Sequence, residues 1–224
     1  MEAVACVFDA YGTLFDVHSA IRRYHTQLGP SADAISQMWR GKQLEYSWLR
    51  SLMRSHADFW EVTRQALDFT FEAFGVFDEA LKQALLEAYL RLDCYPDVKG
   101  VLLQLKQRGF RCAILSNGSP AMLAAAVQSG SLAGLFERVI SVEEAGTYKP
   151  APSVYQLAVE QLRVPANEVC FLSANAWDAA GAARFGFRAV WINRFRQPRE
   201  RLPFGPEVEI QSLAELPALL GLAS

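Results

Sequence analysis

The sequence predicts an α/β fold, in which a parallel sheet is covered by helices on both faces. Two observations support this prediction. Short apolar segments that resemble buried strands alternate with helical stretches along most of the chain. The interval 17–93 interrupts this alternation, because its apolar residues recur at helical spacing. A chain of 224 residues is long enough for one domain that carries a smaller inserted domain.

The predicted strands are short apolar runs, as expected for a parallel sheet that is buried on both faces. They cover residues 4–8, 111–115, 138–141, 169–172 and 189–192. Helices of suitable length are predicted at 97–108, 120–128, 153–161 and 178–185. Parallel strands are joined by right-handed helical crossovers, so these elements form βαβ units. The proline-rich tail after residue 197 predicts loops and a short final helix.

Residues 17–93 are predicted to form four or five helices, inserted between the first and second strands. Apolar residues such as Met38, Leu44, Trp48 and Leu52 recur there at helical spacing. We therefore assign residues 1–16 and 94–224 to a core domain and residues 17–93 to a helical cap domain.

The composition is that of an ordinary globular protein, with 51% hydrophobic residues, 21% charged residues and a net charge of −2. No basic block suggests nucleic acid, no apolar run is long enough to cross a membrane, and no signal peptide is recognisable. The cysteines form no C-x-x-C pair, and Cys6, Cys112 and Cys170 lie in predicted strands. We expect buried thiols and a cytoplasmic location. The histidines lack the spacing of a zinc site.

Polar residues follow four of the predicted strands. The segments are 9–13 after the first strand, 116–118 after the second, 149–150 after the third and 173–178 after the fourth. A single Asp after a strand is equally well explained as a helix N-cap. In a parallel sheet, however, all four loops meet at one edge, where open α/β sheets bind their ligands. The sequence therefore predicts one crevice with carboxylates, hydroxyls, amides and an ammonium group.

These motifs, Asp-x-x-Gly-Thr, Ser-Asn-Gly, Lys-Pro and Ser-x-Asn-x-x-Asp, resemble the haloacid dehalogenase superfamily over essentially the whole chain. Three segments are similar to its L-2-haloacid dehalogenase branch: Phe-Asp-Ala-Tyr-Gly-Thr-Leu-Phe-Asp-Val at 8–17, Trp-Arg-Gly-Lys-Gln-Leu-Glu-Tyr at 39–46 and Ser-Ala-Asn-Ala-Trp-Asp at 173–178. The resemblance implies a Rossmann-like core with a small helical cap, a 2-haloacid substrate, a halide product, no cofactor and a homodimer.

Two positions argue against phosphate chemistry. Phosphatases of this superfamily use a second Asp, two residues after the nucleophile, to protonate the leaving alcohol. Tyr11 stands there, and a phenol with a pKa near about 10 suits that role poorly. Asn175 stands where a carboxylate would help to hold Mg²⁺, which prefers anionic oxygen ligands. A halide needs neither an acid nor a metal to leave.

The resemblance implies a two-step mechanism without a metal. Asp9 attacks C2 of an L-2-haloalkanoate and forms an ester, which water then hydrolyses to a D-2-hydroxy acid. The catalytic residues implied are Asp9, Thr13, Arg40, Lys149, Ser173, Asn175 and Asp178. Arg40, with Asn117 and Trp177, is expected to face the halide, and Asn175 and Asp178 to activate the water. The substrate-binding residues implied are Ala10, Tyr11, Leu44, Phe59, Ser116, Asn117, Tyr155 and Trp177, of which Tyr155 supports Lys149 or Asp178 from behind.

Two other functions compete with dehalogenation. One is a phosphatase of the same superfamily, acting on a small phosphate ester. The other is a non-catalytic binding protein on this scaffold, although every catalytic position is filled. One departure from the dehalogenase pattern is Gly41, where relatives carry a longer polar residue. We expect it to widen the pocket or to shift a helix.

Overall fold

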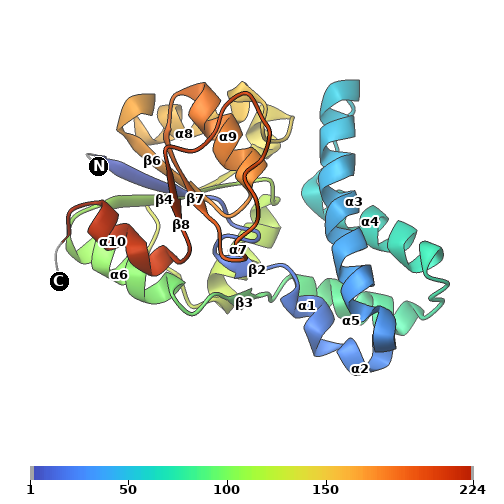
Figure 1. The fold of residues 1–224 in the computed structure, drawn as a ribbon. Coiled ribbons are helices and arrows are strands. Elements are labelled where there is room, and N and C mark those ends of the chain that lie inside the picture. Colours follow the sequence, from blue (N-terminus) through green and yellow to red (C-terminus); the bar gives the residue numbers. More distant parts are fainter. Residues whose placement is uncertain (1–2, 223–224) are drawn as a thin grey trace.

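A computed structural model describes residues 3–222. Its main sheet has six parallel strands in the order β5-β4-β1-β6-β7-β8 (Figure 1). The strands are β1 (Ala5–Phe8), β4 (Arg111–Ser116), β5 (Arg138–Ser141), β6 (Val169–Ser173), β7 (Arg188–Ile192) and β8 (Val208–Ile210). The predicted α/β fold class is confirmed.

The central strand β1 lies between β4 and β6. Its residues Ala5–Phe8 are all fully buried, as expected for an apolar run with neighbours on both sides and helices on both faces. Phe8 is opposite Ile114 on one side and Leu172 on the other, so β1 ends within two residues of the ends of β4 and β6. The loops that follow them therefore start side by side.

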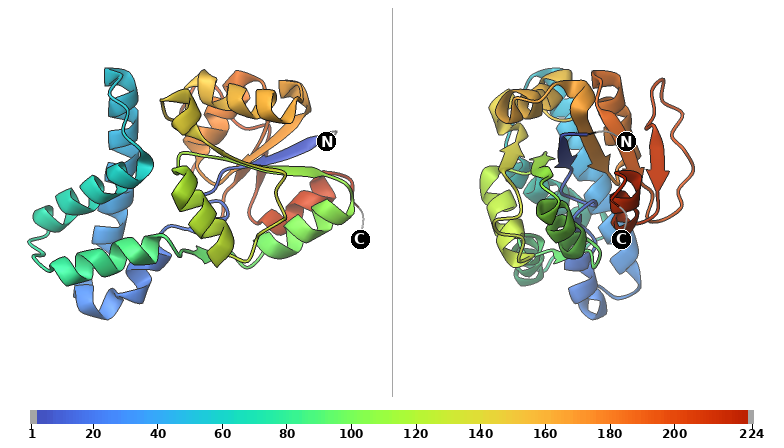
Figure 2. Two further views of the ribbon diagram at one scale, coloured as in Figure 1. Left: turned by 180° about the vertical axis from the view of Figure 1, so that it is seen from behind. Right: turned by 90° about the vertical axis from the view of Figure 1, so that its left-hand side faces the viewer.

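Helices cover both faces of the sheet (Figures 1 and 2). On one face lie α8 (Pro152–Leu162) and α9 (Ala176–Phe185). On the other lie α6 (Val98–Gln107), α7 (Pro120–Ser129) and α10 (Leu216–Leu219). This arrangement agrees with right-handed crossovers, since the chain moves in opposite directions from β4 to β5 and from β5 to β7.

The helices of residues 17–93 stand apart from the sheet (Figures 1 and 2). They are α1 (Ser19–Arg23), α2 (His25–Leu28), α3 (Ala32–Met53), α4 (Phe59–Ala73) and α5 (Glu79–Tyr89). Two connections join them to the core, and these pair as the short antiparallel strands β2 (Phe15–Asp16) and β3 (Asp93–Cys94). We propose that these helices form a cap domain with the limits suggested by the sequence.

Two elements outside the site were not predicted from the sequence. The tail forms strand β8 as well as loops and a final helix, because Val208 and Ile210 extend the sheet beside β7. The short β2–β3 pair was not predicted.

The four cysteines are free thiols. Within residues 3–222, no helix has the length and apolar character needed to span a membrane.

Candidate active site

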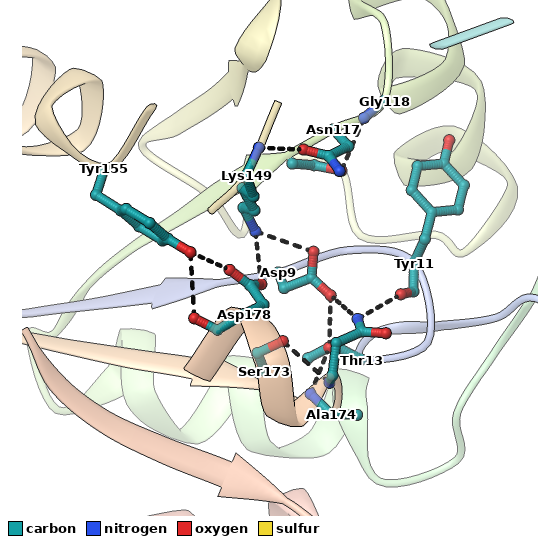
Figure 3. Close-up of polar contacts among 12 residues, drawn as sticks. Asp9, Tyr11, Thr13, Asn117, Gly118, Lys149, Tyr155, Ser173, Ala174 and Asp178 are labelled. Carbon is teal, nitrogen blue, oxygen red and sulfur yellow. Dashed lines mark hydrogen bonds and ion pairs between the residues drawn. The ribbon is translucent and has the colours of Figure 1, made fainter. Parts of the chain in front are cut away.

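Asp9 lies directly after β1, where the strand ends between its two neighbours (Figure 3). Its backbone N–H donates to the carbonyl oxygen of Leu172, 2.9 Å away, which continues the ladder by one residue. The chain then turns sharply at Gly12, whose φ of +91° is strained for any other residue. This turn leaves the Asp9 side chain only 6% exposed and directed toward the neighbouring loops.

Three side chains hold the Asp9 carboxylate from three different loops. Thr13 Oγ1 and Asn175 Nδ2 each donate to Oδ2 at 2.8 Å, and Lys149 Nζ donates to Oδ1 at 3.1 Å. Thr13 Oγ1 also accepts a hydrogen bond from the backbone N–H of Ala174 at 2.8 Å, so its hydroxyl proton is directed to Asp9. The carboxylate is therefore oriented and largely removed from water.

Lys149 connects Asp9 to a second buried carboxylate. Its Nζ is 2.8 Å from Asp178 Oδ2, while Tyr155 donates to Asp178 Oδ1 at 2.8 Å (Figure 3). Burial alone would lower the pKa of Lys149, but the facing carboxylates of Asp178 and Asp9 raise it above its ordinary value. The ammonium is thus permanently charged, and the cluster of two carboxylates and one ammonium carries a net charge of −1.

Asp178 differs from an ordinary carboxylate in its proton affinity. Burial raises its pKa to about 6, against the opposing effect of Lys149 and with a further increase from the charge of Asp9. A carboxylate with a pKa near 6 is ionised at neutral pH and is basic enough to accept a proton from water. Asp178 lies one turn into α9, and Asn175 is the residue that precedes this helix.

Arg40 reaches the site from helix α3. Its Nη2 is 3.3 Å from both the carbonyl oxygen of Tyr11 and Oδ1 of Asn175. Its Nη1 is buried and has no hydrogen-bond partner. In the described part of the chain Arg40 forms no ion pair with a carboxylate, so it presents an uncompensated positive charge next to Asp9. Such a buried donor is suited to bind an anion.

Aromatic side chains form one wall of the site. The Tyr11 ring stacks on Tyr89 at 5.7 Å between centroids and lies 5.9 Å from Phe59. It also packs so closely on Gly118 that a Cβ there would be 2.6 Å from the ring. Burial raises the pKa of Tyr11 well above its ordinary value, and electrostatic repulsion from the neighbouring Tyr89 hydroxyl adds to this increase. The phenol is therefore an even weaker acid than a free tyrosine.

The other predicted residues occupy supporting positions. Ser116 Oγ accepts from the N–H of Gly118, and Ser173 Oγ accepts from the N–H of Asn175, both at 3.1 Å. Asn117 Oδ1 accepts from the backbone N–H of Lys149 at 3.1 Å. These bonds shape the loops and leave both serine hydroxyl protons free to donate. The buried carbonyl of Ala10 accepts from three N–H groups of the Asp9 turn.

Two predicted residues of the apolar wall and halide pocket are less enclosed. Leu44 is half-buried on α3, one turn after Arg40. Trp177 is also half-buried, and its ring packs edge-on against Trp48 of the cap at 5.3 Å. Arg40 thus contacts Tyr11 and Asn175, whereas Asn117 and Trp177, which were expected beside it, contact Lys149 and Trp48 respectively.

The expectation for Gly41 is wrong. This residue is exposed on the same side of α3 as Gln37 and Glu45, which are also exposed. A Cβ at this position would meet no atom within 4 Å. Because Gly41 is on the solvent side of the helix, a longer side chain there would leave the pocket and the helix position unchanged.

Three residues near the site were not singled out from the sequence. Tyr89 supports the Tyr11 ring and donates to Gln43 Oε1 at 3.3 Å, and Gln43 is buried. Arg194 donates to the carbonyl oxygen of Thr13 at 3.2 Å. Arg194 follows strand β7, so the strand-end argument would have located it. Gln43 lies within the cap motif, whereas nothing in the sequence marks Tyr89.

The donor set does not fit a divalent cation. Magnesium requires several free oxygen ligands. Both oxygens of Asp178 are engaged by Lys149 and Tyr155, and the Asp9 carboxylate is engaged by Thr13, Asn175 and Lys149. The Lys149 ammonium already bridges the two carboxylates. Among residues 3–222, no cluster of three His, Cys, Asp or Glu side chains is arranged to hold a metal.

Comparisons with known proteins agree with this geometry. The sequence model of one protein family, the haloacid dehalogenase-like hydrolases, matches residues 4–186 of this chain. The (S)-2-haloacid dehalogenase 1 of Pseudomonas sp. (strain CBS-3) is 50% identical over 96% of each chain. The haloacetate dehalogenase H-2 of Moraxella sp. (strain B) is 44% identical over 87% of each chain.

A solved structure of a related enzyme shows the same fold. It is the L-2-haloacid dehalogenase from Xanthobacter autotrophicus with chloropropionic acid covalently bound, which is 38% identical, covers 99% of this chain and 100% of its own, and has a TM-score of 0.92. The resemblance found in the sequence motifs is confirmed. This chain belongs to the haloacid dehalogenase-like hydrolases, in the group that contains the (S)-2-haloacid dehalogenases.

Proposed function

We propose that this protein hydrolyses short L-2-haloalkanoic acids to D-2-hydroxy acids, through an ester on Asp9 and without a metal. The observation that carries the proposal is the Asp9 carboxylate, held by Thr13, Asn175 and Lys149 with the phenol Tyr11 two residues on. The curated relatives named above are dehalogenases of such acids. A homodimer and a cytoplasmic location remain predictions from the sequence.

In the first step, a carboxylate oxygen of Asp9 forms a bond to C2 as the carbon–halogen bond breaks and its electron pair leaves with the halide. Attack from behind that bond inverts the configuration at C2. The free Nη1 of Arg40 supports a role in binding the departing halide, since a fixed cation is most effective where charge develops. Ser116 and the N–H groups of Ala10 and Tyr11 are assigned to the substrate carboxylate.

In the second step, water attacks the Asp9 side-chain carbonyl carbon while Asp178 accepts its proton. The bond from that carbon to the hydroxy acid oxygen then breaks, and this oxygen takes the proton back from Asp178. The Asp9 carboxyl releases the second proton of the water to solvent, which restores its carboxylate. The pKa of about 6 at Asp178 supports its assignment as the base. Asn175, which precedes the same helix, is assigned to orient the water, with Ser173 supporting its backbone.

Asp9→Asn tests the nucleophile. An amide is a poor nucleophile, so halide release over many turnovers is expected to stop. Asp33→Asn is the matched control, because Asp33 is exposed on α3, and it is expected to keep full activity. Sustained halide release by an Asp9→Asn protein, verified by mass to be free of deamidation, would refute the assignment.

Isotope labelling tests the order of events. In a single turnover in ¹⁸O-water, the label is expected in Asp9 and absent from the hydroxy acid, since water attacks the side-chain carbon. Label found first in the product would mean that water attacks C2 directly. Chiral analysis of the product from fluoro-, chloro- and bromo-acids of both hands tests the stereochemistry. Loss of halide release in EDTA would contradict the metal-free mechanism.

A further inference from the structure

A small cavity lies behind the nucleophile turn, on the side of strand β7. Its volume is about 150 Å³, and its lining includes Gly12, Val17, Asn175 and Arg194. At its inner end, Gly12 lies against the Asn175 side chain, whose Nδ2 is 2.8 Å from Asp9. At its outer end, Phe195 and Gln197 are exposed to solvent on the loop that connects β7 and β8 (Figure 1). The cavity thus extends from the surface to the Asn175 side chain, which separates it from the Asp9 carboxylate.

The exposed surface of the lining is mainly apolar, and the charged groups beside it are compensated. The Arg194 guanidinium makes two hydrogen bonds to Asp97, at 2.7 and 3.0 Å, and lies over the Tyr95 ring. Burial, and to a smaller extent the charge of Arg40, lowers the pKa of His18, which is therefore neutral at pH 7. A lining without net charge favours neutral polar molecules over halide or haloacid anions.

The size of the cavity suits water. One water needs roughly 10–15 Å³ of such volume, so the cavity has room for several. The amides of the lining are already engaged, because Asn175 Nδ2 donates to Asp9, and Asn193 Nδ2 donates to the carbonyl oxygen of Gln197 and to Glu209. The cavity can therefore admit water without binding it tightly.

The rest of the site offers water little access. Lys149, Asp178 and Tyr155 are each at most 1% exposed, which closes the side of the second carboxylate. In the ester form of the enzyme, the bound acyl group occupies the side of Asp9 toward Arg40 and the cap. The cavity at Gly12 and Asn175 approaches the Asp9 turn from a different direction.

We propose that this cavity is the route by which water reaches the aspartyl ester, and that the Asn175 side chain is its inner gate. The proposal rests on the proposed function, because it assumes the ester on Asp9. Asn175 directly precedes α9 and Asp178 lies in its first turn, so water that passes Asn175 arrives next to the assigned base. The cavity serves the second step only, and the first step is independent of it.

Filling the cavity tests the route. Val17→Phe adds a large side chain to the lining, and Ala174→Val adds a smaller one at a second point. Val139→Phe is the matched control, because Val139 is 44% exposed on the distant strand β5. A single turnover of L-2-chloropropionate with excess enzyme is quenched at intervals, and intact mass measures ester formation and ester decay.

The ester is expected to decay about tenfold more slowly in Val17→Phe, equivalent to a barrier higher by about 1.4 kcal/mol. Its formation should stay within about twofold of the original protein, which also shows that the variant is folded. Ala174→Val should slow decay in the same direction, and Val139→Phe should leave both rates unchanged. Unchanged decay in both filled variants would refute the water route while leaving the ester mechanism intact. If no ester forms in any of these proteins, the proposed function itself fails.

Discussion

The buried carboxylate of Asp178 provides a sharp test of the hydrolysis step, because asparagine has nearly the same shape and no charge. In Asp178→Asn, the amide oxygen can still accept from Lys149, and the amide NH₂ can donate to the Tyr155 hydroxyl. The geometry of α9 and of the Asp9–Lys149 pair is therefore retained. What is lost is the group assigned to take the proton from water.

The effect on stability follows from the pKa of Asp178. A shift from 3.8 to about 6 means that the ionised side chain costs about 3 kcal/mol in the folded state, at 1.36 kcal/mol per unit. The folded state binds this proton more tightly, so the cost develops as the pH rises from about 4 to about 6 and is complete above that range. Asparagine removes this cost, and the hydrogen bond to Lys149 is already included in it, because the shift is the net effect of burial, Lys149, Asp9 and Tyr155.

Asp178→Asn should thus not lower the free energy of unfolding at pH 7 and should raise it by up to about 3 kcal/mol. Ester formation should continue, while ester hydrolysis slows by about 10²–10⁴-fold, the usual contribution of a general base. Urea unfolding measures the first quantity, and rapid quenching with intact mass measures the second. Normal turnover without accumulated ester would refute the role of the base, and a loss of stability would refute the charge reasoning.

Three further changes probe the same cluster. Lys149→Met leaves the carboxylates of Asp9 and Asp178 without a cation, so urea unfolding at pH 7 should show a loss of about 3–5 kcal/mol, smaller at pH 5, where Asp178 gains a proton. The ester hydrolysis rate should fall as the pH is lowered and Asp178 is protonated, with a midpoint below about 6, because the ester removes the charge of Asp9 that helps to raise this pKa. Tyr155→Phe removes a hydrogen bond that lowers the pKa of Asp178 and should move the midpoint upward in a pH–rate profile. Thr13→Val leaves a buried backbone N–H unpaired and should cost about 1–3 kcal/mol in urea unfolding, with slower ester formation in the quench assay. An unchanged midpoint, or an unchanged unfolding curve, would contradict the respective assignment.

Most of the core could be predicted because local patterns determine it. A run such as Val4–Phe8 has no polar residue to place on a solvent face, so it must lie inside a covered sheet. Once the strands are parallel, the loops that begin at Asp9, Ser116 and Asn175 converge without further information. The structure then brings Thr13, Asn175 and Lys149 within hydrogen-bonding distance of Asp9, as the strand-end argument requires.

The elements that were not predicted depend on partners far away in the chain. Strand β8 has three residues between proline-rich loops, and it forms because β7 offers an open edge. Strands β2 and β3 have two residues each and pair across the whole cap. Such short segments carry no readable periodicity. Gly41 shows the same limit for a single residue, since its side of α3 depends on what the helix packs against.

Two arginines show which part of the site depends on tertiary structure. Arg40 and Arg194 both reach the Asp9 turn, the first through the carbonyl of Tyr11 and the second through the carbonyl of Thr13. Asp97 pairs with Arg194 and neutralises it, whereas Arg40 keeps a buried, unpartnered Nη1. Strand ends can indicate that a cation reaches the site, but only the folded pairing determines which cation keeps its charge. That pairing is the reason to assign the halide to Arg40 and the water route to the cavity beside Arg194.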